Sequence, residues 1–173
     1  EFLIDRYGII KNGQSVLVIG SSPGGWTQVL VERSCHVLSV DIQPMQEIPG
    51  VKFLKLNILR EDAPERIREA MTDSGIEAFD TVLSDAMSKT SGIKSSDHAS
   101  SVVIGDAVMK IAVETLRRGG TAVLKQFQGD MTNDFIRRWG QYFRDHKITK
   151  PPASRKESSE IYIIFYGFSG NVG

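Results

Sequence analysis

Short runs of β-branched and other apolar residues alternate along the chain with longer stretches in which apolar residues recur every three or four positions. The first pattern is typical of buried strands and the second of amphipathic helices. We expect strands at 15–19, 36–40, 51–56, 79–84, 121–124 and 161–165, and helices at 26–33, 64–72, 102–118 and 133–143. Strands that alternate with helices predict an α/β fold, with a largely parallel sheet covered by helices on both faces.

Glycine and proline mark the expected boundaries. The pair Gly119-Gly120 is predicted to end the helix over 102–118, since glycine is a common helix terminator. Two segments, 87–98 and 150–159, are predicted to be mobile loops. The chain shows no internal repeat and no composition shift that would separate a second unit, so we expect one domain over 1–173.

The composition is that of an ordinary globular protein. The 173 residues are 40% hydrophobic and 24% charged, which excludes disorder over most of the length. The longest apolar run, 161–168, is too short to cross a membrane. The start at Glu1 lacks the basic and apolar regions of a signal peptide, and we expect a cytoplasmic protein that lacks a short N-terminal segment here.

Cysteine and histidine are too sparse to suggest a metal centre. The single cysteine, Cys35, excludes an internal disulfide and a cysteine-based zinc site, and it is predicted to be a small buried apolar residue. The three histidines, His36, His98 and His146, are scattered and are expected to be structural or surface residues.

The charge is balanced over the whole chain but not along it. Lysine and arginine total 21, as do aspartate and glutamate, so the formal net charge is zero. Acidic residues outnumber basic ones between positions 42 and 85, whereas the segment 147–156 has four basic residues and no acidic ones. Its basic residues are Lys147, Lys150, Arg155 and Lys156. A local basic patch binds phosphates even on a neutral protein, but charge alone is equally compatible with a solvated face.

A glycine-rich loop over 20–26 follows the first predicted strand and opens a helix. Its three glycines allow a tight turn and the close approach of a ligand to the backbone. The loop lacks the Gly-Lys-Ser/Thr of a phosphate-binding P-loop, and its G-x-x-x-G-G spacing differs from the dinucleotide fingerprint. Asp41 lies at the end of the next strand, where a carboxylate accepts hydrogen bonds from ribose hydroxyls. The loop and the acid predict an adenosine-bearing ligand and leave its identity open.

Three further residues are predicted to meet at one edge of the sheet. Asp85 and Lys125 follow strands that would be neighbours, and Glu160 begins the last strand, which reaches the same edge if it runs antiparallel. A lysine between two carboxylates is either a base or a fixed positive charge beside a developing alkoxide. Ordinary salt bridges are the alternative.

Five segments, taken in order, resemble the FtsJ-like ribose 2′-O-methyltransferases. They are 20–28 (GSSPGGWTQ), 41–45 (DIQPM), 84–85 (SD), 125–129 (KQFQG) and 154–162 (SRKESSEIY). The resemblance covers nearly the whole chain, and the short length is most similar to bacterial-type members that act on large-subunit ribosomal RNA. It implies a Rossmann-like, S-adenosylmethionine-dependent methyltransferase fold with an antiparallel last strand.

The resemblance also implies how the cofactor is held. The cofactor-binding residues that it implies are Gly20, Ser21, Pro23, Gly24, Gly25, Trp26, Asp41, Ile42, Asn57 and Asp85. Asp41 would hold the ribose hydroxyls, and Asn57, which stands where the family usually has an acid, would contact the adenine. Trp26 packs either against the cofactor or into the core.

The family has a Lys–Asp–Lys–Glu catalytic set, whose last three members match Asp85, Lys125 and Glu160. The place of the first lysine is just upstream of Glu1. The implied reaction is 2′-O-methylation of RNA, at a uridine of large-subunit (23S-type) ribosomal RNA. The basic residues of 147–156 would hold RNA phosphates. The segment 86–92 departs from the family's usual run, which leaves the target open.

Three alternatives remain at this stage. In the first alternative, the chain methylates a tRNA or another RNA. In the second it is an NAD-binding oxidoreductase, and in the third it is an RNA-binding module without catalytic activity. RNA is the expected partner, no metal or membrane is expected, and a monomer is favoured.

Overall fold

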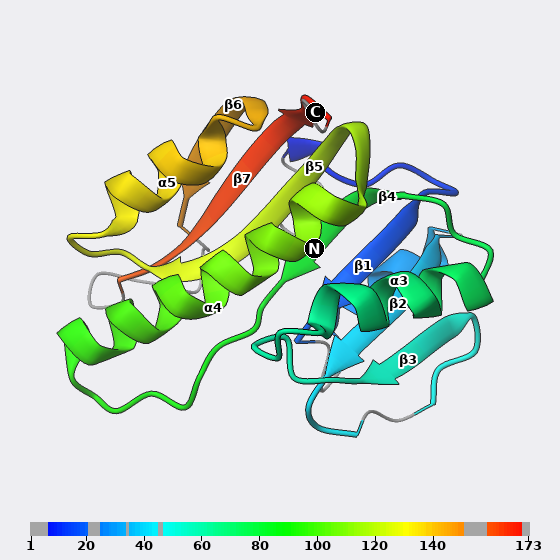
Figure 1. Cartoon of the computed structure of the whole chain (residues 1–173), viewed down its shortest axis with the longest axis horizontal. Coiled ribbons are helices and arrows are strands. Elements are labelled where there is room, and N and C mark those ends of the chain that lie inside the picture. The colour runs from blue at the N-terminus through cyan, green and yellow to red at the C-terminus, as the bar shows by residue number, and fades with distance from the viewer. Residues whose placement is uncertain (1–6, 21–24, 34, 45–46, 151–158, 171–173) are drawn as a thin grey trace.

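The fold is an α/β sandwich in which helices cover a central twisted sheet (Figure 1). The computed structural model describes residues 7–20, 25–33, 35–44, 47–150 and 159–170. In chain order the elements are β1 (Ser15–Ile19), α2 (Gly25–Glu32), β2 (His36–Asp41), β3 (Val51–Lys55), α3 (Ala63–Asp73), β4 (Phe79–Ser84), α4 (Lys94–Thr115), β5 (Leu116–Phe127), α5 (Thr132–Gly140), β6 (Phe143–Thr149) and β7 (Glu160–Phe168).

The seven strands form one sheet in the order β3-β2-β1-β4-β5-β7-β6. The pairs β2–β3, β1–β2, β1–β4 and β4–β5 are parallel, whereas β7 runs antiparallel to both β5 and β6. The predicted mixed sheet with an antiparallel last strand is thereby confirmed. Because the strand order reverses between β1 and β4, a crevice is expected beyond the carboxyl ends of these two strands.

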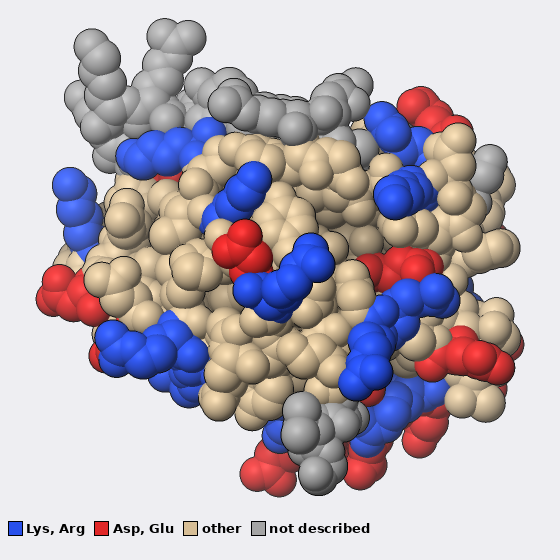
Figure 2. All heavy atoms as spheres, turned by 90° about the horizontal axis from the view of Figure 1, so that it is seen from above, with Lys and Arg blue, Asp and Glu red and all other residues tan. Residues whose placement is uncertain are grey.

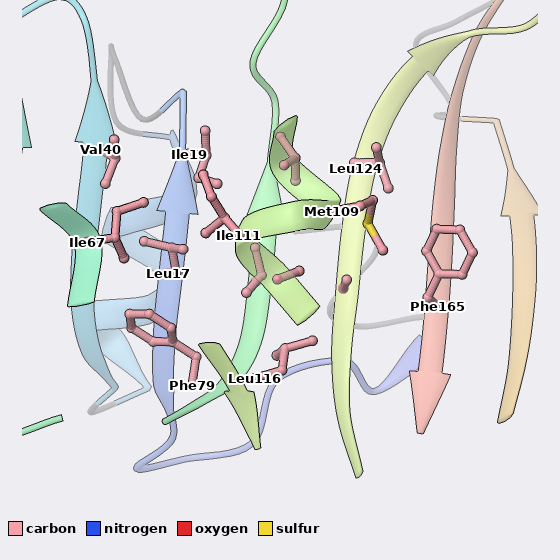
Figure 3. Packing of buried hydrophobic residues seen from close by; sticks show 14 of the residues in the cluster. Leu17, Ile19, Val40, Ile67, Phe79, Met109, Ile111, Leu116, Leu124 and Phe165 are labelled. Carbon is pink, nitrogen blue, oxygen red and sulfur yellow. The ribbon is translucent and has the colours of Figure 1, made fainter. Parts of the chain in front are cut away.

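Successive side chains of a strand point to opposite faces of the sheet, and apolar residues are buried on both faces. Leu17 and Ile19 of β1 join the larger apolar cluster, which includes side chains of α3, α4 and α5. Figure 3 shows them packed beside Ile67 of α3 and Ile111 of α4. The intervening β1 residues face the opposite way, into a smaller cluster with Leu30 of α2. Helices therefore cover both faces, as predicted.

The boundary between α4 and β5 differs from the prediction. The helix ends at Thr115 and the strand begins directly at Leu116, so Gly119-Gly120 lies inside β5. Phe79 of β4 pairs with Leu116 and Thr81 pairs with Thr121, so β5 carries extra residues in a bulge between these two pairs. Gly119 has a φ of +84° there. The two glycines serve this bulge rather than a helix end.

Other predictions of elements and their boundaries were also wrong. The helix α4 begins at Lys94, not at 102, so the end of the predicted loop 87–98 is helical. The strand β6 was not predicted, and the expected helix over 133–143 ends at Gly140 instead. Five of the seven β6 residues are exposed, because this strand lies at the sheet edge and pairs with β7 alone.

The predicted burial of Cys35 and the predicted structural or surface positions of the three histidines are confirmed. Cys35 is buried, and this burial raises the pKa of its thiol. His98 is buried with hydrogen bonds at both ring nitrogens, whereas His36 and His146 are exposed. Over the described ranges, no helix has the length and apolar character needed to cross a membrane.

Candidate functional site

A cleft of about 510 Å³ opens beyond the carboxyl ends of β1, β2, β3 and β4, where the strand order reverses. Its lining residues include five of those predicted to bind the cofactor, which are Gly20, Asp41, Ile42, Asn57 and Asp85. These residues follow four different strands, so the parallel sheet gathers them at one edge. Sequence reasoning missed further lining residues, among them Leu59, Met87 and Ile104.

The backbone at Gly20 crosses very close to the segment after β4. The Gly20 N–H donates to the Val40 carbonyl oxygen at 2.8 Å, and the Asp85 N–H donates to the Ile19 carbonyl oxygen at 3.1 Å. Gly20 has a φ of +77°, and a Cβ there would lie 2.7 Å from the Ala86 nitrogen. Only glycine fits this crossing, which holds the carboxyl ends of β1 and β4 together.

Two side chains at the rim of the cleft fix turns after their strands. An Asp41 carboxylate oxygen accepts the Gln43 N–H at 3.0 Å, and the Asn57 side-chain oxygen accepts the Leu59 N–H at 3.0 Å. Such turns hold the polar side chain in one orientation. Ile42 and Leu59 line the same cleft with exposed fractions of 55% and 52%, and such apolar surface suits a planar ring.

Asp85, Lys125 and Glu160 meet beside the cleft. The Lys125 Nζ lies 3.8 Å from an Asp85 carboxylate oxygen and 3.7 Å from a Glu160 carboxylate oxygen. Both contacts are ion pairs that are longer than a direct hydrogen bond. The three side chains keep only 20–27% of their surface exposed. An amine held between two half-buried acids can receive or stabilise charge on a nearby hydroxyl.

Strand register explains how these residues converge. Ser84 pairs with Leu124 at the end of the β4–β5 ladder, so Asp85 and Lys125 directly follow on neighbouring strands. Because β7 runs antiparallel to β5, its first residue, Glu160, pairs with Phe127 at the same edge. Glu160 and Lys125 therefore lie on one face of the sheet.

Tyr162 is a fourth member of this cluster. Its hydroxyl donates to an Asp85 carboxylate oxygen at 3.0 Å, and Lys125, its cross-strand partner, places Nζ 5.9 Å from the ring centroid. Burial, followed by the charge of Asp85, raises the pKa of Tyr162 well above its usual value, so the hydroxyl stays a donor. Sequence reasoning assigned Tyr162 no role, although its place two residues after Glu160 puts both on one strand face.

Several predicted cofactor-binding residues lie outside the described part of the chain. They are Ser21, Pro23 and Gly24. Gly25 is the first residue of α2, and the side chain of Trp26 in the same helix also lies outside the description.

Of the four predicted RNA-binding residues, Lys147 and Lys150 are described, whereas Arg155 and Lys156 lie outside the described residues. Lys147 is exposed on β6, with its Nζ 5.8 Å from the centroid of the Tyr7 ring and 5.9 Å from that of Tyr166. Lys150 is exposed directly after β6. Figure 2 shows one face of the molecule, on which lysine and arginine side chains are interspersed with aspartate and glutamate.

The described residues contain no group of three or more histidine, cysteine, aspartate or glutamate side chains that could hold a metal ion.

The sequence was then compared with known proteins. A family model described as FtsJ-like methyltransferase matches residues 1–168. The chain belongs to the FtsJ-like methyltransferase family. Over 170 residues it is 79% identical to the Ribosomal RNA large subunit methyltransferase E of Thermoplasma acidophilum, covering 98% of this chain and 83% of that protein. A protein of the same name from Picrophilus torridus is 50% identical over 162 residues, with 93% of this chain and 84% of that protein covered.

Solved structures agree with the family. The crystal structure of a putative ribosomal RNA methyltransferase from Plasmodium falciparum matches with a TM-score of 0.86 and 28% identity, covering 98% of this chain and 94% of that one. A putative methyltransferase from Streptococcus mutans, solved in complex with SAH, has a TM-score of 0.58 at 10% identity, covers 93% and 90% of the two chains, and supports the fold alone.

Family membership confirms the predicted methyltransferase activity and its methyl donor, S-adenosylmethionine. It decides against the NAD-binding oxidoreductase and the module without catalytic activity. The cleft of this FtsJ-like methyltransferase fits an adenosine-bearing cofactor. Two polar side chains, Asp41 and Asn57, line it beside exposed apolar surface, and the tight crossing at Gly20 lines it together with Asp85.

Proposed function

We propose that this FtsJ-like methyltransferase methylates a ribose 2′-hydroxyl of RNA, at a uridine of large-subunit ribosomal RNA. The feature that supports this best is the amine of Lys125 between Asp85 and Glu160 beside the cofactor cleft. A ribose hydroxyl is a poor nucleophile, and such a cluster is suited to assist it. The relatives named as ribosomal RNA large subunit methyltransferases support the choice of RNA.

S-adenosylmethionine, when bound, supplies a methyl group on a sulfonium, which is already a good methyl donor. The chain's own residues then have two tasks, alignment of the hydroxyl and handling of its proton. Asp41 and Asn57, which line the cleft, would hold the ribose and the adenine, and the exposed Ile42 and Leu59 would offer apolar surface to the base. Asp85 lies at the inner end of the cleft, next to the lysine.

Lys125 acts on the hydroxyl. The bond from the hydroxyl oxygen to the methyl carbon would replace the carbon–sulfur bond of the sulfonium. The hydroxyl proton passes to Lys125 if the amine is neutral, whereas a protonated Lys125 stabilises the developing alkoxide and the proton passes to water. Glu160 and Asp85 orient the amine, and the Tyr162 hydroxyl holds an oxygen of Asp85. Alignment of this kind contributes several kcal/mol to lowering the barrier.

The end of β6 offers a path for the RNA backbone. Thr149, the last residue of β6, pairs with Tyr162, which in turn pairs with Lys125. Lys150 therefore follows at the same sheet edge, two strand spacings or about 10 Å from Lys125. With Lys147, Arg155 and Lys156 it would hold phosphates beside the target nucleotide.

The test uses two variants with opposite defects. Lys125→Ala should lower methyl transfer to RNA by at least about a thousandfold, as expected for loss of a proton-handling group, while S-adenosylmethionine still raises its melting temperature. Asp41→Ala should lose that rise. The exposed Lys110→Ala on α4 is the control and should match the wild type in both measurements.

The target is tested with large ribosomal subunits, free large-subunit RNA and tRNA, followed by mapping of 2′-O-methylated nucleotides. A single methylated uridine in the large-subunit RNA is the expected result. Methylation of tRNA alone, or of a base in place of a ribose, would contradict the proposed target. Full activity of Lys125→Ala would remove the lysine from the reaction.

A further inference from the structure

The strand that carries Lys125 extends beyond its parallel neighbour. The last pair of the β4–β5 ladder is Ser84 with Leu124, but β5 continues to Phe127. Beyond Leu124, β4 offers no partner to the backbone groups on that side of β5, and half-buried backbone groups are costly when unpaired.

The second turn of α4 supplies the missing partners. The Phe127 N–H donates to the Ser101 Oγ at 3.1 Å, and the Phe127 carbonyl oxygen lies 2.6 Å from the His98 Nδ1. Ser101 Oγ in turn donates to the His98 carbonyl oxygen at 2.7 Å. Two buried side chains of one helix thus continue the hydrogen bonding of β5 where the sheet stops.

The other nitrogen of His98 holds the loop that follows. The Met131 N–H donates to the His98 Nε2 at 3.0 Å. Because Nε2 accepts this hydrogen bond, the ring proton is on Nδ1, which donates to Phe127. The ring also packs so closely on Gly129 that any Cβ there would collide with it. His98, with its ring proton on Nδ1, therefore holds both ends of the segment between β5 and α5.

We infer that His98 is a positioning residue for methyl transfer, an assignment that rests on the proposed function of Lys125 and Glu160. Phe127, which His98 holds, lies two residues after Lys125 and pairs with Glu160 across the ladder. The neighbouring residue in α4, Asp97, accepts hydrogen bonds from Ser91 and Gly92 in the segment that follows Asp85. One end of α4 thus anchors the end of β5 after Lys125 and the segment that follows Asp85.

Kinetics of two His98 variants test this assignment. His98→Phe keeps an aromatic ring and loses both hydrogen bonds, and it should lower kcat by roughly 10- to 100-fold, as small displacements of a reacting group do. KM for S-adenosylmethionine should stay within about twofold, because neither Phe127 nor Met131, the two residues bonded to the His98 ring, lines the cleft. His98→Asn, whose amide can donate to Phe127 in place of Nδ1, should recover most of kcat. The exposed His36→Phe is the control and should match the wild type.

Two results would overturn the assignment. One is a wild-type kcat in folded His98→Phe, and the other is an Nε2–H tautomer of His98 in the wild-type protein by ¹⁵N NMR, which needs no variant to fold. Lys125→Ala in the same assay separates the two proposals. If it stays active, the proposed role of Lys125 fails, whereas an inactive Lys125→Ala beside a fully active His98→Phe would reject the positioning role alone.

Discussion

At the scale of single residues, the conformation of Gly20 does more than permit a turn. Its positive φ and the nearby Ala86 backbone are two separate constraints, and Gly50 shares the first without the second. Gly50 has a φ of +86° and nothing within 4 Å of its Cβ position. This pair separates the cost of backbone strain from the cost of a steric clash.

Gly20→Ala should therefore destabilise the fold more than Gly50→Ala. The Gly50 change should cost about 1 kcal/mol for the left-handed conformation alone. The Gly20 change should cost about 3 kcal/mol and weaken S-adenosylmethionine binding, because the crossing next to Asp85 must open. Urea unfolding and calorimetry measure both. Equal costs at the two sites would show that the crossing at Gly20 is not as tight as described.

The ionisation of Tyr162 should lower the free energy of unfolding at alkaline pH. Its pKa is raised in the folded protein by burial and then by Asp85, whereas in the unfolded chain it ionises near pH 10. The stabilisation is complete below about pH 10 and is lost as the pH rises above it, because only the unfolded chain then releases the proton. The free energy of unfolding should fall by up to about 1.4 kcal/mol per pH unit from this group.

The check is denaturant unfolding between pH 9 and 11. Tyr162→Phe should show a shallower loss of stability over this range than the wild type. Tyr142→Phe, at an exposed position, should keep the wild-type slope. An unchanged slope in Tyr162→Phe would mean that the hydroxyl is not held by Asp85.

The sequence predicts which residues matter more readily than how they are held. Asp85, Lys125 and Glu160 are identifiable because each stands at a strand end within a motif of the family. Two contacts are not identifiable, the donation from Tyr162 to Asp85 and the double hydrogen bond of His98. Both depend on strand register and rotamers between residues that are far apart in the chain, and no local pattern encodes these.

At the scale of elements, Asp97 decides how α4 begins. Its carboxylate accepts hydrogen bonds from the Ser91 N–H at 2.7 Å, the Ser91 Oγ at 2.9 Å and the Gly92 N–H at 3.2 Å. The bond from the Ser91 backbone is the largest cause of the lowered pKa of Asp97. The same segment continues into Met87 and Ser88, which line the cleft.

Asp97→Asn should loosen this segment without unfolding the protein. Faster proteolysis over 87–93 and faster amide exchange at Gly92 are expected, because an amide accepts these hydrogen bonds more weakly than a carboxylate. Lowering the pH should loosen the wild type in the same way, since a depressed pKa stabilises above about pH 3.9 and the effect is lost as Asp97 is protonated. Asp73→Asn, at the exposed end of α3, is the control and should leave the segment protected.

Elements with strong apolar patterns were predicted, and those with weak patterns were not. The strands β1 (SVLVI), β2 (HVLSVD) and β4 (FDTVLS) are mostly buried and each contains several apolar residues, and their limits agree with the prediction within one residue. β6 (FRDHKIT) is an exposed edge strand with mostly polar residues, so it has no apolar pattern. Its pairing with β7 holds it in the sheet. The start of α4 has no apolar periodicity, and Asp97 fixes it through side-chain hydrogen bonds instead.

At the scale of the whole molecule, strand order is what turns a list of residues into a site. Alternating strands and helices predict a parallel sheet, but they leave open which strands are neighbours. The reversal between β1 and β4 places the cleft, and the antiparallel β7 brings Glu160 to the same edge as Lys125. The resemblance to the family implied the antiparallel last strand, but the sequence analysis gave no strand order, since no local physical signal specifies it.

The balanced charge of the molecule predicts a modest salt dependence of RNA binding. With zero net charge and mixed signs over the face in Figure 2, phosphate contacts should come from the few residues around the end of β6. Four contacts to single-stranded RNA imply a slope of about −3 for the logarithm of affinity against the logarithm of salt concentration. Filter binding between 50 and 200 mM salt measures this slope.

Lys150→Ala should weaken the affinity and make the slope shallower by about 0.7, the contribution of one released counterion. Lys110→Ala, the exposed lysine on α4, should leave both values unchanged. A slope near −8 in the wild type would mean that the RNA contacts a much wider basic surface than the end of β6 provides. A slope unaffected by Lys150→Ala would instead move the RNA path away from β6, because a phosphate contact there must release its counterion when it forms.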